Sequence, residues 1–209
     1  MLRLFKMIVL FFTSLVMLIP QASPSNGQDN PIDRYNGGDP YIANDNGQFY
    51  YTYTTGNGIV IRHITSFCNT EEIERKTVYT AGRNDIVGDI WAPEIHQINS
   101  KWYIIASALF DKNKVEKGAM PLASGYNDNN DWYRYGFVLE SVTDDIFGDY
   151  EFKGRLAPAG LNNIDGTFMQ LNGKLYFIFS GYVDCAYQCI YITEMDNPYT
   201  VKPCSAVQK

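Results

Sequence analysis

Two aspartates at matched positions are the residues of this chain best placed to do chemistry. Asp39 lies seven residues before Asn46-Gly47, and Asp165 lies seven residues before Asn172-Gly173. Asn-Gly between alternating apolar residues is the strongest short signal for a two-residue β-hairpin turn. The shared spacing predicts that both carboxylates stand at the start of equivalent strands, in copies of one repeating unit.

A third copy lies between these two, in the segment WAPEIHQINSKWYIIAS. Asn99-Ser100 takes the turn position there, and counting back seven residues gives Ala92. Glu94 is two residues further along and therefore on the same face, since strand side chains alternate with a period of two. Trp91 precedes this pair, and its indole either stacks on a sugar or fills space between sheets.

Three carboxylates that converge from separate units have a familiar use. Hydrolysis of a glycosidic bond needs one group to activate water and another to protonate the leaving oxygen, and neighbouring charges hold their pKa values apart. Taken alone, Asp39 before Pro40 and Asp165 before Gly166 could simply form turns. Their common register favours a shared site. His96, on the same face as Glu94, is expected to be a core histidine.

Short strands separated by turn residues predict an all-β fold built from four-stranded antiparallel units, which are the blades of a β-propeller. A β-sandwich also uses short strands, but it gives no reason for acids at the same phase of successive hairpins. A polar insertion is expected at 109–131. The expected strands are 40–43, 48–54, 58–65 and 75–79; 95–98, 102–107, 136–142 and 150–153; and 168–171, 174–180, 189–194 and 201–204.

The first 22 residues have the pattern of a signal peptide, with basic residues before an apolar run that is too short to span a bilayer. Residues 23–36 are expected to be an extended lead-in, and residues 37–209 a partial propeller domain. We therefore expect a secreted, extracellular protein. The net charge of −6 disfavours nucleic acid and anionic membranes as partners, since both attract basic surfaces.

Four cysteines would then lie in an oxidising compartment, where disulfides persist. They allow three full pairings, and Cys185 and Cys189 are close enough in sequence for a local bridge. Nothing in the sequence pairs Cys68 with Cys204. Neither histidine lies at zinc-ligand spacing from a cysteine pair, so no metal site is predicted.

Three motifs together resemble glycoside hydrolase family 43, and most of all its secreted exo-acting α-L-arabinofuranosidase branch. They are GGDPYI with its Asn-Gly hairpin, IWAPEIH followed by KWYIIASA, and IDGTFMQLNGKLYFIFSG followed by CIYITEMDNPYT, and the resemblance covers about residues 30–203. It implies a five-bladed propeller and an inverting mechanism. It also implies that Asp39 is the general base, that Asp165 tunes the pKa of the acid and orients substrate, and that Trp91 and Glu94 line the pocket.

The family's general acid is a glutamate of the fourth blade, usually within Glu-Gly-Pro, and no such motif occurs in these 209 residues. We therefore expect about three blades here, an apparently truncated propeller, and little hydrolysis by this chain. The substrate implied is a plant cell-wall arabino-oligosaccharide or polysaccharide, with β-xylosidase as the nearest competing activity. A secreted non-catalytic sugar-binding or effector protein is the alternative. No cofactor is expected, although some family members hold a structural calcium in the channel.

Overall fold

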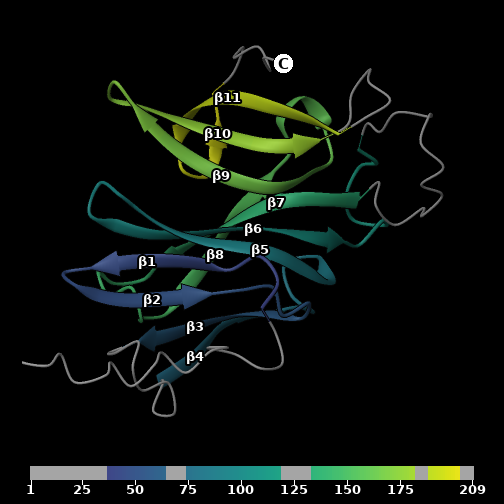
Figure 1. Ribbon diagram of the computed structural model, residues 1–209. Coiled ribbons are helices and arrows are strands. Elements are labelled where there is room, and N and C mark those ends of the chain that lie inside the picture. Colours follow the sequence, from purple (N-terminus) through teal and green to yellow (C-terminus); the bar gives the residue numbers. More distant parts are fainter. Residues whose placement is uncertain (1–36, 65–73, 119–132, 182–187, 203–209) are drawn as a thin grey trace, which may run out of the picture.

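The computed structural model describes residues 37–64, 74–118, 133–181 and 188–202. The expected signal peptide and lead-in, residues 1–36, lie outside the described residues. Three four-stranded antiparallel sheets follow one another along the chain, and the second lies between the other two (Figure 1). Within the described ranges, no helix has the length and apolar character needed to cross a membrane.

Each sheet is a simple meander, in which every strand pairs with the next one along the chain. The first blade contains β1 (Tyr41–Asp45), β2 (Gln48–Thr52), β3 (Gly58–Ile64) and β4 (Glu74–Thr80). The second contains β5 (Ile86–Ile98), β6 (Lys101–Phe110), β7 (Arg134–Ser141) and β8 (Tyr150–Leu156). A short 3₁₀ turn, η2 (Pro158–Gly160), leads to β9 (Asn163–Leu171), β10 (Lys174–Gly181), β11 (Cys189–Asn197) and β12 (Thr200–Val201).

The first hairpin of every blade turns at the pair of residues predicted from the sequence. Asn46, Asn99 and Asn172 all have φ near 50°, and the residue after each also has positive φ. Two consecutive left-handed residues define the type I′ turn, whose twist matches that of the flanking strands. The predicted repeat of hairpins is confirmed.

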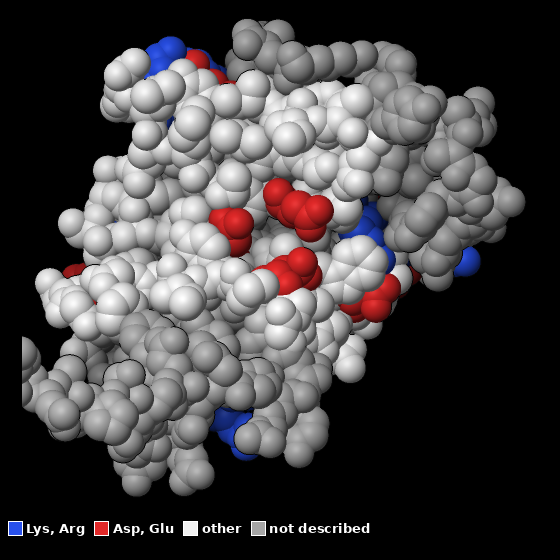
Figure 2. Space-filling model, in the orientation of Figure 1, with Lys and Arg blue, Asp and Glu red and all other residues white. Residues whose placement is uncertain are grey.

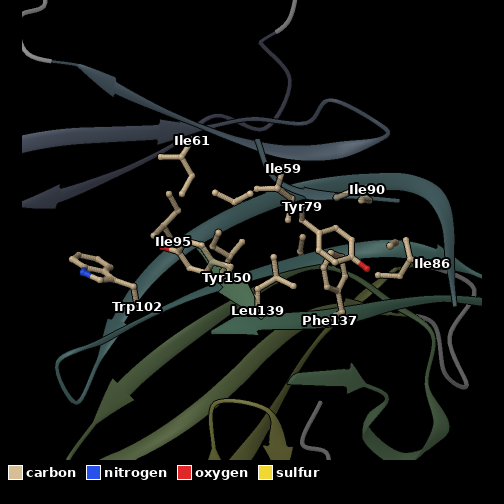
Figure 3. Close-up of a cluster of buried hydrophobic side chains, with 14 of the residues drawn as sticks. Ile59, Ile61, Tyr79, Ile86, Ile90, Ile95, Trp102, Phe137, Leu139 and Tyr150 are labelled. Atoms are coloured by element: carbon tan, nitrogen blue, oxygen red, sulfur yellow. The ribbon is translucent and has the colours of Figure 1, made fainter. Parts of the chain in front are cut away.

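The second blade is buried on both faces, which explains why β6 reads as the continuous apolar run WYIIASALF. Trp102, Ile104 and Phe110 of β6 belong to the cluster shared with the first blade. Figure 3 shows Trp102 in this cluster together with Ile59 and Ile61 of β3. Tyr103, Ile105 and Val138 belong to a second cluster, which is completed by Phe177, Phe179 and Tyr191 of the third blade. This stacking of three sheets differs from a two-layer sandwich.

The strands that run innermost are longer than the sequence predicted. β5 begins at Ile86 rather than at Ile95, and β9 begins at Asn163 rather than at Phe168. β5 contains two left-handed residues, Asp89 and Ala92, and β9 contains one, Asp165. Register shifts between Ile86 and Glu94 in β5, and opposite Ile178 and Ser180 in β9, accommodate these residues, so both strands continue past them. β6 extends to Phe110, into the expected insertion, and residues 119–131 of that insertion lie outside the described residues.

Candidate active site

The same backbone conformation recurs at the three equivalent positions of the innermost strands. Asp39, Ala92 and Asp165 have φ of 53°, 44° and 51°. Left-handed φ is uncommon outside glycine and clusters at functional sites, where the surrounding structure holds it in place. The register inferred from the Asn turns thus extends back to these three positions, each seven residues before its turn.

The structure brings the three predicted carboxylates together. Partial burial, followed by the negative charges of Asp39 and Glu94, raises the pKa of Asp165 above its ordinary value of 3.8. Contacts between β1 and β5, and between β5 and β9, place the three inner strands side by side. Acidic side chains surround a hollow in the middle of the face shown in Figure 2.

Asp39 is exposed, and Thr54, just beyond β2, binds it from one side. The Thr54 hydroxyl donates to Oδ2 of Asp39 at 2.6 Å, and the Thr54 backbone N–H donates to the carbonyl of Gly38 at 2.9 Å. Two hydrogen bonds from Thr54 therefore connect the turn that carries Asp39 to the segment that follows β2. Nothing in the sequence around Asp39 indicated this partner.

Glu94 and His96 form a pair on β5. Oε2 of Glu94 lies 2.8 Å from Nε2 of His96, and the two side chains are 25% and 15% exposed. The His96 ring contacts Tyr41 of the first blade and Phe168 of the third, with centroid distances of 5.3 and 5.5 Å. His96 packs between blades, as expected of a core histidine, but it also fixes Glu94. Burial, and then the charge of Glu94, raises the pKa of Tyr41.

Trp91 is half-buried and lies on a guanidinium. Cζ of Arg134, on β7, is 3.5 Å from the centroid of the indole ring. Arg134 is only 4% exposed, and it donates to both the backbone carbonyl and the carboxylate of Asp89 at 3.1 Å. Cation–π stacking of this kind is stronger where water is excluded. Arg134 thus covers one face of Trp91, and neither Arg134 nor Asp89 was singled out from the sequence.

Comparison with known proteins decides the family. Residues 28–208 match the model of glycosyl hydrolases family 43, which is most of the chain. The chain belongs to this family.

Two curated relatives of this family 43 chain are named extracellular exo-α-(1→5)-L-arabinofuranosidase. The one from Streptomyces avermitilis is 27% identical over 95% of this chain and 40% of its own length. The one from Streptomyces chartreusis is 26% identical over 83% of this chain and 50% of its own length. The family 43 chain therefore spans about half or less of the length of these relatives.

Solved structures agree on the fold. An α-L-arabinofuranosidase from Lactobacillus brevis superposes with a TM-score of 0.66 at 24% identity, over 85% of this chain and 55% of that one. A Cellvibrio cellulosa α-L-arabinanase superposes with a TM-score of 0.52 at 14% identity, over 83% and 52% of the two chains. The three meanders are thus an incomplete set of propeller blades of the family 43 kind.

The tight packing behind Asp165 yields a first prediction. A Cβ added to Gly166 would lie 2.5 Å from Cε2 of Phe177, which is fully buried and stacked on Phe179. We expect Gly166→Ala to lower the free energy of unfolding by about 1–3 kcal/mol, the usual cost of overpacking a core. Gly154→Ala is the matched control, because its Cβ would meet nothing closer than 3.9 Å. Equal stability of the two variants in urea unfolding would contradict the packing argument.

The raised pKa of Asp165 yields a second prediction. A carboxyl that binds its proton more tightly in the folded state destabilises folding once the pH rises above the unfolded value of 3.8. Asp165→Asn should therefore be more stable than the parent at neutral pH, and this advantage should fade as the pH falls through the window down to 3.8. Urea unfolding at the two pH values checks this, with the exposed loop residue Asp144→Asn as control. If Asp165→Asn is less stable than the parent at neutral pH, ionised Asp165 does not destabilise the folded state and the prediction is wrong.

The described residues bear on only part of the metal and disulfide predictions. Among the described residues, no group of three or more His, Cys, Asp or Glu side chains is arranged to hold a metal ion. The absence of a cofactor remains a prediction. Cys189, at the start of β11, is disulfide-bonded. Cys68, Cys185 and Cys204 lie outside the described residues, so the choice among pairings stays open.

Proposed function

We propose that this protein hydrolyses α-L-arabinofuranosyl linkages with inversion at the anomeric carbon. Asp39 accepts a proton from water, the water oxygen bonds to the anomeric carbon, and the bond from that carbon to the leaving oxygen breaks. The leaving oxygen takes the bonding electron pair, and in a natural glycoside it must also take a proton from an acid or from solvent. The observation that carries the proposal is the convergence of Asp39, Glu94 and Asp165 from three blades, with Asp39 and Asp165 both in a left-handed conformation.

Asp165 serves this reaction as a second, nearby charge. Burial and the other two carboxylates raise the pKa of Asp165, so this carboxyl keeps its proton to a higher pH than an ordinary aspartate does. A carboxyl in this state can donate a hydrogen bond to a sugar hydroxyl, and after ionisation it can stabilise positive charge at the anomeric carbon. This is consistent with a role in orienting the substrate and in setting the pKa of a neighbouring acid.

Trp91 and Glu94 complete the proposed pocket. Trp91 is half-buried, with Arg134 on one face, and an aromatic ring of this kind is suited to stacking on a sugar. Glu94 is oriented by His96 and offers a carboxylate oxygen to sugar hydroxyls. The names of the curated relatives favour arabinose-containing oligosaccharides or polysaccharides as substrate, and the word extracellular in two of those names favours secretion.

The sharpest test uses a substrate whose leaving group needs no acid. The leaving group of a natural arabinoside is a sugar alkoxide, which must be protonated as it departs. Such general acid catalysis commonly raises the rate by about 10²–10⁴-fold, whereas nitrophenolate leaves without it. The 209-residue chain contains no Glu-Gly-Pro, so we expect measurable turnover of 4-nitrophenyl α-L-arabinofuranoside and far slower release of arabinose from arabino-oligosaccharides. Proton NMR of the first product should show the inverted anomer.

Two comparisons make that test decisive. 4-Nitrophenyl β-D-xylopyranoside is the competing substrate, and a higher kcat/KM for it would assign the site to xylosides. Retention of configuration would rule out Asp39 as a base acting on water. Binding of arabino-oligosaccharides without hydrolysis of either aryl glycoside would favour a non-catalytic sugar-binding protein.

A further inference from the structure

Thr54 connects the candidate general base to the neighbouring blade. Its Oγ1 donates to Oδ2 of Asp39 at 2.6 Å, and the same oxygen accepts the backbone N–H of Ala92 at 2.8 Å. Asp39 belongs to the first blade, and Ala92 lies on β5 of the second. Within the described part of the chain, a single hydroxyl therefore joins two of the three left-handed positions of the site.

The two contacts decide which way the hydroxyl points. A threonine hydroxyl has one proton to donate. The Ala92 N–H can only donate, so the oxygen of Thr54 must act as acceptor toward it, and the hydroxyl proton remains for the carboxylate. The hydrogen bond to Oδ2 therefore has a fixed direction. It leaves Oδ1, to which no described residue donates, as the oxygen that can take a proton from water.

The surrounding backbone keeps Thr54 in place on both sides. Its own N–H donates to Gly38 O at 2.9 Å, next to Asp39. Two residues later, Gly56 and Ile90 exchange backbone hydrogen bonds of 2.8 and 3.3 Å. The hydrogen bond from the Ala92 N–H to the Thr54 hydroxyl is a third contact between the first and second blades in this region. The position of the hydroxyl is thus set by both blades together.

We propose that Thr54 is a positioning residue for the hydrolytic reaction, which orients the carboxylate of Asp39 through its hydroxyl and couples it to the left-handed Ala92 of the second blade. This inference rests on the proposed function. A tilted carboxylate would still bind sugar but would meet the attacking water poorly. Loss of the hydroxyl should therefore lower kcat more than it raises KM, since misplacement by about 1 Å can cost about 10²-fold in rate.

The test compares Thr54→Val, which keeps the shape without the hydroxyl, with Thr54→Ser, which keeps the hydroxyl. On 4-nitrophenyl α-L-arabinofuranoside we expect Thr54→Val to lower kcat about 10- to 100-fold with KM changed less than about threefold, and we expect Thr54→Ser to keep most of the parent's rate. Hydrogen exchange of the Ala92 amide, followed by NMR, should be faster in Thr54→Val than in the parent and close to the parent in Thr54→Ser. If Thr54→Val does not fold, Thr54→Ala replaces it.

Each result decides the matter. Unchanged exchange at Ala92 in the Val variant would show that the bridge does not exist. Faster exchange with unchanged kcat would show that the hydroxyl stabilises the fold without positioning the base, and either result would overturn the inference while the parent still hydrolyses substrate. A parent that hydrolyses no arabinoside would overturn the proposed function itself, and the positioning role with it.

Discussion

Asp39→Asn is expected to lower kcat/KM for 4-nitrophenyl α-L-arabinofuranoside by about 10²–10⁴-fold, the range typical for loss of a general base. Asparagine keeps the size of the side chain and an oxygen for the Thr54 hydroxyl, but its amide cannot accept a proton from water. The fold should therefore survive while activation of water is lost. Steady-state kinetics together with thermal unfolding separate these two effects.

Azide provides a positive readout for the same variant. It is a small anion that attacks without deprotonation, so it bypasses the missing base. We expect it to restore turnover of Asp39→Asn and to give an arabinofuranosyl azide of inverted configuration. Asp144→Asn, which removes an exposed carboxylate between β7 and β8, is the control and should keep the activity of the parent. Full activity of Asp39→Asn would remove Asp39 from the mechanism.

Local spacing was enough to predict the repeat and the acids at its head. The Asn turns fix the phase of each inner strand, and side chains alternate along it, so Asp39, Glu94 and Asp165 could be placed on one face from sequence alone. The same reasoning could not give the start of β5 or β9. Left-handed residues and bulges interrupt the alternation there, and no short pattern marks them.

The residues that hold the site were missed because their contacts join distant parts of the chain. Thr54 reaches Asp39 across 15 residues and Ala92 across 38, and Arg134 reaches Asp89 across 45. The sequence offered one indication of these contacts, which is that Arg134 begins the largely apolar strand RYGFVLES. A buried arginine requires a partner, so that indication predicts an ion pair but cannot say with which acid.

Asn163 is a buried polar residue whose side chain makes three hydrogen bonds to backbone groups. Its side chain is almost fully buried at the start of β9, two residues before Asp165. Oδ1 accepts the backbone N–H of Gly136 at 2.7 Å, and Nδ2 donates to the carbonyls of Leu156 and Leu161 at 3.0 and 3.1 Å. One amide therefore satisfies three backbone groups and attaches the third blade to the second.

Asn163→Ala should lower the free energy of unfolding by about 3–5 kcal/mol. Each buried backbone group left without a partner costs about 1–3 kcal/mol, and water entering the space recovers part of the sum. Asn44→Ala is the matched control, because Asn44 is exposed and accepts one bond, from Gly47 at 3.2 Å, and it should cost less than about 1 kcal/mol. Urea unfolding measures both variants. Equal losses would mean that the junction between the blades depends on apolar packing alone, and that the head of β9 keeps its place beside Asp39 without Asn163.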